Sequence, residues 1–136
     1  MRVFLDTNVL VSAFAARGLC AELIEVILRG HELVTGRNVL RELRKALREK
    51  VKATPLRCDE AVASIVHGAA QVVEAADPAK CESSVKDALV LGEAMKGKAE
   101  LFVTGDAALL RLKSVESMRI VSPRELWDAL RSESGT

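Results

Sequence analysis

Aromatic residues are scarce in this chain of 136 residues, at 3% of the composition. A core must therefore be built from leucine, valine, isoleucine and alanine, which the hydrophobic fraction of 49% allows within one domain. Apolar runs are too short to span a bilayer, which takes roughly 20 residues, so we expect no membrane association. The chain begins with a strand-like segment rather than a signal-peptide layout, so we expect a cytoplasmic protein.

Cysteines are few and widely spaced, and no C-x-x-C pair occurs, so the sequence indicates neither a disulfide framework nor a zinc site. We expect Cys20, Cys58 and Cys81 to be reduced thiols. The chain also lacks G-x-G-x-x-G, and Gly97-Lys98 lacks the flanking residues of a phosphate-binding loop. No motif places a histidine base beside a serine or cysteine nucleophile, so covalent catalysis of that kind has no support.

The net charge of +1 conceals an uneven distribution. Residues 37–57 contain eight basic and two acidic residues, a net +6, which leaves −5 for the rest of the chain. A basic stripe beside an acidic cluster suits a polyanion whose backbone approaches a metal site. Taken alone, the stripe is better explained as a solvated helix face. Its candidate binding residues are Arg37, Arg41, Arg44, Lys45 and Arg48.

Strand-like and helical segments alternate, which predicts a parallel α/β sheet. The expected strands are 3–5, 32–35, 71–74, 101–103 and 118–121. The expected helices are 9–14, 20–28, 39–49, 58–70, 84–96 and 107–112, with a last one opening at Ser122-Pro123. We expect a single domain over residues 1–131 and a disordered tail over 132–136.

Four carboxylates lie where a strand changes to a helix or just inside the following helix: Asp6, Glu42, Asp87 and Asp106. Asp6 and Asp106 have an ordinary explanation as helix caps, and Asp87 fits a capping box that starts at Ser84. Glu42 differs, because it lies off the basic face of its helix and beside the apolar stripe. A half-buried acid at that border needs a partner.

Taken together, the four acids indicate a cation site, which none of them indicates alone. In an open α/β sheet, ligands bind beyond the carboxyl ends of the strands, at the point where the strand order reverses. Acids gathered there repel one another unless a cation neutralises them. Oxygen ligands without histidine or cysteine favour Mg²⁺ or Mn²⁺ over Zn²⁺. Such an ion can activate water and stabilise the leaving oxygen of a phosphodiester.

Four segments, in this order, resemble the PIN-domain ribonucleases, and among them the single-domain toxins of bacteria and archaea. They are Leu-Asp-Thr-Asn-Val-Leu at 5–10, Leu-Arg-Glu-Leu at 40–43, Asp-Ala-Leu-Val-Leu-Gly-Glu-Ala at 87–94 and Val-Thr-Gly-Asp-Ala-Ala-Leu-Leu at 103–110. The first and last are fairly specific together, although either alone is weak. The segments lie between residues 5 and 110, so the resemblance extends over nearly the whole chain.

The resemblance implies a three-layer α/β/α fold with a five-stranded parallel sheet. It implies a Mg²⁺- or Mn²⁺-dependent endoribonuclease in which Asp6, Glu42, Asp87 and Asp106 are the acidic ligands. Asn8 and Thr104 would orient Asp6 or a bound water. Many relatives are toxins that a small antitoxin inhibits, and many are homodimers, so both kinds of partner are expected.

One position departs from the family pattern. Relatives often carry a further aspartate just before the third acid, where this chain has Lys86. Glu82 is a possible substitute whose position the sequence does not fix. The departure puts a second metal ion in doubt more than the first.

Three other functions are alternatives to the metal-dependent endoribonuclease. A non-catalytic RNA- or protein-binding module on the same fold would not need four acids. A phosphatase of the haloacid-dehalogenase type normally needs an aspartate where this chain has Asn8, and a phosphate receiver needs adjacent acids near the first strand.

Trp127 is expected to pack onto the sheet, with a dimer or antitoxin surface as the alternative.

Overall fold

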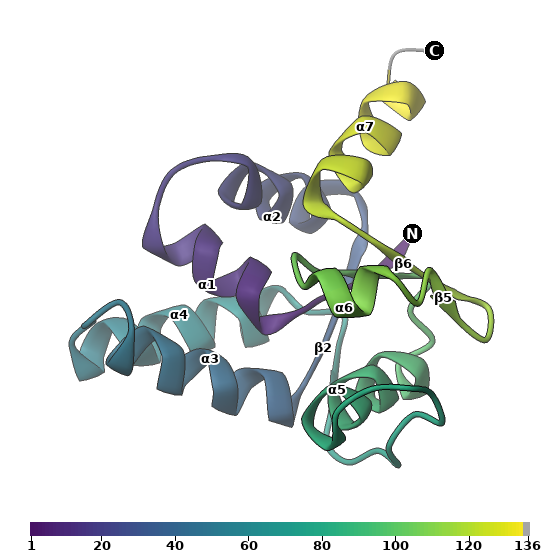
Figure 1. Ribbon diagram of the computed structural model, residues 1–136. Helices are drawn as coiled ribbons and strands as arrows, with labels where there is room; N and C mark the ends of the chain where they lie inside the picture. Colours follow the sequence, from purple (N-terminus) through teal and green to yellow (C-terminus); the bar gives the residue numbers. More distant parts are fainter. Residues whose placement is uncertain (135–136) are drawn as a thin grey trace.

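The computed structural model describes residues 1–134 and contains one mostly parallel sheet (Figure 1). Its strand order is β3-β2-β1-β4-β6-β5, and only β5 runs antiparallel to its neighbour. The strands are β1 (Arg2–Leu5), β2 (Glu32–Gly36), β3 (Gln71–Val73), β4 (Leu101–Val103), β5 (Ser114–Val115) and β6 (Met118–Val121). The strand order reverses beside β1: β2 and β3 lie on one side of it, and β4 and β6 on the other.

Seven helices connect or follow the strands over the described residues. They are α1 (Thr7–Ala15), α2 (Leu19–Gly30), α3 (Arg37–Glu49), α4 (Pro55–Gly68), α5 (Val85–Lys96), α6 (Ala107–Leu110) and α7 (Pro123–Ser134). Figure 1 shows α1 to α4 gathered on one side of the strands and α5 on the other. Helix α5 packs on the β2 face that carries Val34 and Gly36, since a Cβ on Gly97 would meet Val34 and one on Gly36 would meet Glu93.

The core is aliphatic, as the composition requires. Phe4 and Phe102, on the adjacent central strands β1 and β4, stack with ring centroids 5.5 Å apart. Around them lie buried leucines, valines and isoleucines from both strands and helices, each contributing about 1.5–3 kcal/mol by burial. Trp127 is partly buried against this core. The three cysteines are free thiols.

The α/β class and the five parallel strands are confirmed, but the sheet has a sixth strand that the sequence did not reveal. β5 is only two residues long and pairs with β6 across a tight turn in which Glu116 has a φ of 53°. Helix α4 begins earlier than predicted, because Pro55 occupies its first turn and the Thr54 side chain caps it by accepting from Arg57 N.

Helix α7 continues to Ser134, so residues 132–134 of the expected disordered tail are helical, and residues 135–136 lie outside the described residues. Within residues 1–134, none of the helices has the length and apolar character needed to cross a membrane.

Candidate functional site

The carboxyl ends of β1 and β4 lie side by side at the point where the strand order reverses. Leu5 pairs with Val103, and the backbone N–H of Asp6 donates to the Val103 carbonyl at 2.9 Å. The next residue of each chain segment, Asp6 and Thr104, is therefore brought to the same edge. This is the edge at which open α/β sheets bind ligands.

A hydrogen-bond network holds the Asp6 carboxylate in place. The Thr104 hydroxyl donates to Asp6 Oδ2 at 2.7 Å, Asn8 Nδ2 donates to the same oxygen at 3.1 Å, and Thr7 N donates to Oδ1 at 2.8 Å. Asn8 Oδ1 in turn accepts from Gly105 N at 3.0 Å. Asn8 and Thr104 thus contact Asp6 directly, as the orienting role expected of them requires.

The acids at helix starts also act as ordinary caps. Asp6 is the N-cap of α1, and Asp106 is the N-cap of α6, where it accepts from Ala108 N at 2.8 Å. Ser84 caps α5 by accepting from Asp87 N at 3.1 Å. The cap explanation and a site explanation are compatible, because a carboxylate has about four acceptor positions and a cap bond uses one.

Glu42 points from α3 toward the same edge. Only 21% of its side chain is exposed, and its Oε2 accepts from the Thr7 hydroxyl at 2.8 Å. Its Oε1 lies 3.5 Å from Lys86 Nζ. The sequence predicted that this half-buried acid needs a partner but did not identify one. The structure gives it two, Thr7 and Lys86.

All four predicted acids line one open pocket of about 640 Å³, here called the acidic pocket. Its charged lining is Asp6, Glu42, Glu49, Asp87, Asp106, Lys45, Lys50 and Lys86. Five acidic and three basic residues give a formal charge of −2. Within residues 1–134, no three acidic, histidine or cysteine side chains converge closely enough to form a ready-made metal site. Glu82 does not line this pocket.

The electrostatics of Asp6 show that the acids interact. Burial raises the pKa of Asp6 above its ordinary value, and hydrogen bonds from Thr104 and Thr7 oppose this by lowering it. The charges of Asp87 and Glu42 raise the pKa of Asp6 further. A cation among these carboxylates would relieve that repulsion. The oxygen-only donors therefore fit a hard divalent ion, although the side chains are not gathered around one point.

Comparison with known proteins was consistent with this arrangement. The PIN domain family model matches residues 2–108. The chain belongs to the PIN-domain family. PIN domains are generally nucleases and typically use divalent metal ions.

The fold is also similar to a chain in a crystal structure of VapBC2 from Rickettsia felis bound to a DNA fragment from their promoter. The identity is 13%, the TM-score is 0.66, and the match covers 90% of this chain and 98% of that one. No curated protein sequence matches this PIN domain.

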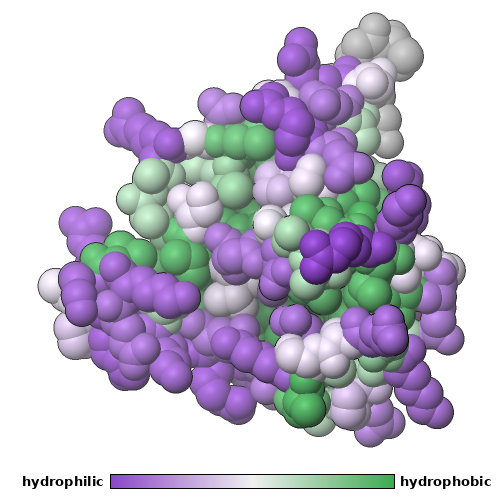
Figure 2. Space-filling view, viewed as in Figure 1, coloured by the Kyte–Doolittle hydropathy of each residue, from purple (hydrophilic) through white to green (hydrophobic). Residues whose placement is uncertain are grey.

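The basic residues of α3 do not form one free stripe in this PIN domain. Three of the candidates face acids: Arg37 pairs with Glu74 at 2.8 Å, Arg44 with Asp59, and Arg48 with Glu49 at 3.7 Å. Arg41 donates to the Asn38 side chain at 3.2 Å. Lys45 instead lines the acidic pocket. Figure 2 shows that the surface over the α3 region is mainly hydrophilic.

Glu93 is a further acid near the site, outside the pocket lining, and the sequence analysis missed it. It lies on α5 at 1% exposure, and its Oε2 accepts from Asn38 N at 2.9 Å in the first turn of α3. Burial raises its pKa, the N–H groups of Asn38 and Val39 lower it, and the charge of Glu42 raises it again. The available signal was a glutamate inside the otherwise apolar stretch 88–95 of α5.

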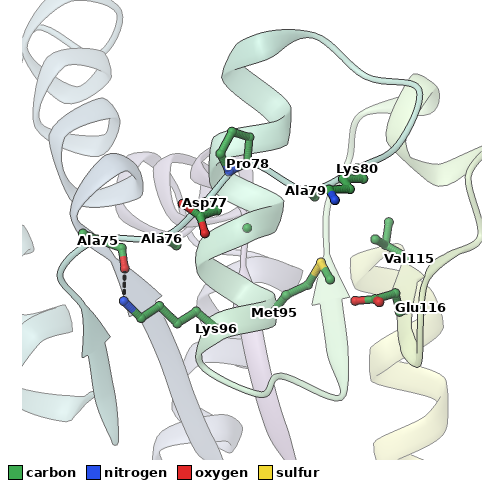
Figure 3. Close-up of a pocket in the computed structure, with 11 residues that line it drawn as sticks. Ala75, Ala76, Asp77, Pro78, Ala79, Lys80, Met95, Lys96, Val115 and Glu116 are labelled. Carbon is green, nitrogen blue, oxygen red and sulfur yellow. Dashed lines mark hydrogen bonds between the residues drawn. The ribbon is translucent and has the colours of Figure 1, made fainter.

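A second pocket, of about 680 Å³, lies between α5, the 75–80 segment and the β5–β6 hairpin (Figure 3). Its lining is mainly alanine, proline, methionine and valine, with Asp77, Glu116, Lys80 and Lys96 at the rim. Lys96 Nζ donates to the Ala75 carbonyl and ties the segment to α5. None of the predicted site residues lines it, so the acidic pocket is the candidate active site of the PIN domain.

Proposed function

We propose that this PIN domain is a metal-dependent endoribonuclease that hydrolyses RNA phosphodiester bonds at the acidic pocket. The observation that carries the proposal is the meeting of Asp6, Glu42, Asp87 and Asp106, from four separate segments, at one pocket beyond the strand ends. Caps alone explain each aspartate, but they do not explain why all of them line the same pocket as Glu42.

The proposed cofactor is Mg²⁺ or Mn²⁺, held by Asp6 and Asp106, with Glu42 and Asp87 binding directly or through water. When bound, such an ion supplies an activated water nucleophile and stabilises the leaving oxygen. The chain's own residues orient Asp6 as a ligand. Thr104 and Asn8 both donate to Asp6 Oδ2 and so restrict the orientation of the Asp6 carboxylate. One carboxylate would assist by accepting the proton of the attacking water.

The basic residues would hold the RNA phosphates that flank the cleavage point without reading the base sequence. Lys45 is the best placed of them, because it shares the pocket with the acids. Arg37, Arg41, Arg44 and Arg48 would contribute at a greater distance, and three of them would first have to exchange an acidic partner for phosphate.

The likeness to a chain of the VapBC2 complex supports a toxin role with a small antitoxin as protein partner. A homodimer is proposed as the assembled form because many of the PIN-domain toxins that the sequence resembles are homodimers. A cytoplasmic location is proposed with that role.

Replacing Asp6 with asparagine tests the proposed activity. Loss of a residue that merely supports a metal ligand typically costs about 10- to 100-fold, so Asp6→Asn should lose at least that much RNA cleavage and Mn²⁺ affinity. Asp128→Asn, on the exposed side of α7, is the matched control and should cleave like the parent. Cleavage of labelled RNA with Mn²⁺ measures both. Full activity of a folded Asp6→Asn protein would show that the proposed site is wrong.

A further inference from the structure

Lys86 is the residue of the acidic pocket that its own helix does not explain. It lies in the first turn of α5, between Val85 and Asp87, where the helix dipole favours a negative charge and disfavours a positive one. Its side chain is 74% exposed, and an ion pair at that exposure contributes little to stability. Neither helix formation nor the pair with Glu42 therefore accounts for a lysine at this position.

Lys86 nevertheless places a positive charge beside the Glu42 carboxylate. Thr7 Oγ1 donates to one oxygen of Glu42, and Lys86 Nζ lies 3.5 Å from the other. Both oxygens of Glu42 are thus engaged by the chain itself. An ion bound at Glu42 would lie beside the Lys86 ammonium group and be repelled by it, whereas Asp6, Asp87 and Asp106 have no lysine within 4 Å among the described ion pairs.

The formal charge of the pocket lining also favours one bound divalent ion over two. The lining carries a formal −2, which one divalent ion neutralises and two ions would turn into +2. An aspartate at position 86 would change the lining to −4, which two divalent ions neutralise. The identity of this one residue therefore decides how many ions the pocket can hold at neutral total charge.

We propose that Lys86 takes the place of a second metal ion, so that the acidic pocket binds one divalent ion and the Lys86 ammonium group supplies the positive charge beside Glu42. The inference rests on the proposed function, since it assumes that the pocket binds metal. In this arrangement Lys86 is also placed to stabilise negative charge on phosphate oxygens that enter the pocket.

Counting bound Mn²⁺ ions without RNA tests the proposal. The signal of free Mn²⁺ in electron paramagnetic resonance gives the stoichiometry for the wild type, Lys86→Asp, Lys86→Gln and Lys80→Asp. Lys80→Asp makes the same charge change on the segment before α5 but outside the acidic pocket. We expect one ion for the wild type and for Lys80→Asp, and two for Lys86→Asp. Lys86→Gln should bind one ion more tightly than the wild type, because the ammonium group no longer repels it.

Two ions in the wild type, or one ion in folded Lys86→Asp, would overturn the proposal and leave the proposed nuclease intact. If Lys86→Asp does not fold, as judged by circular dichroism, Lys86→Gln decides the matter, and an affinity no higher than that of the wild type overturns it. Absence of Mn²⁺ binding by all four proteins would instead contradict the proposed function itself, and the proposal with it.

Discussion

The Thr104 hydroxyl connects three parts of the acidic pocket. It donates to Asp6 Oδ2 at 2.7 Å, accepts from Asp106 N at 3.1 Å, and lies 3.2 Å from Asn8 Nδ2. Thr104 is fully buried, so none of these bonds can be replaced readily by water. Thr35, at the end of β2, offers a contrast within the same molecule, because its buried hydroxyl has no partner among the described residues.

Replacing these threonines with valine, one at a time, should therefore change the free energy of unfolding differently. Thr104→Val removes the shared hydroxyl, and with it the hydrogen bond to the buried Asp6 carboxylate and the one from Asp106 N, at a cost of about 1–3 kcal/mol. Thr35→Val replaces an unpartnered buried hydroxyl with a methyl group and should be neutral or stabilising. Urea denaturation measures both free energies of unfolding. Equal losses of stability in the two variants would contradict the assigned roles.

At the scale of elements, the start of α3 depends on α5. Gly36, the N-cap of α3, makes no side-chain cap bond, and Glu93 of α5 accepts from Asn38 N in its place. A Cβ on Gly36 would lie 2.3 Å from Glu93 Cδ, so only glycine leaves room for the carboxylate. This contact fixes the helix that carries Glu42 against the helix that carries Asp87.

Glu93→Gln should stabilise the protein increasingly as the pH rises. The pKa of Glu93 is raised above its ordinary value in the folded state, mainly by burial. Its favourable contribution is therefore complete below the unfolded pKa and is lost as the pH rises through the folded pKa. Glutamine keeps an acceptor for Asn38 N without the charge. The melting temperatures of wild type and variant should be similar near about pH 4 and diverge toward about pH 8, where a gain of about 1 kcal/mol corresponds to about 4 °C.

Glu25→Gln, on the exposed surface of α2, is the control for Glu93→Gln and should show no such divergence. A Glu93→Gln protein that melts below the wild type at both pH values would show instead that the carboxylate is required as a charged cap.

Local patterns predicted these elements better than they predicted the contacts between them. Alternating apolar segments gave the five parallel strands, and the position of Glu42 beside the apolar stripe of α3 indicated a half-buried acid. The two-residue β5 has no periodicity to detect. The contacts of Glu93 with Asn38 and of Lys86 with Glu42 join residues far apart in sequence, so a helical pattern contains no information about them.

At the scale of the whole molecule, the strongly basic 37–57 segment is partly balanced by two acids from other elements. Glu74 follows β3 and faces Arg37, and Asp59 of α4 faces Arg44. Such exposed pairs contribute little to stability, but they reduce the positive charge that a polyanion meets. Lys45 has no ion pair among the described residues and opens onto the acidic pocket.

Lys45→Ala should therefore weaken RNA binding more than Arg44→Ala does. Each phosphate contact releases about one counterion, so loss of Lys45 should reduce the salt dependence of log Kd by about 1 and loss of Arg44 by less. Fluorescence anisotropy with single-stranded RNA and chelator, at several KCl concentrations, separates binding from cleavage. Arg44 must give up its ion pair with Asp59 before it can pair with a phosphate, so it contributes to RNA binding only the difference between the two pairs. Lys45 has no ion pair within residues 1–134 to give up, so its pairing with phosphate contributes in full. A steeper loss for Arg44→Ala would mean that RNA lies along the outer face of α3 rather than over the acidic pocket.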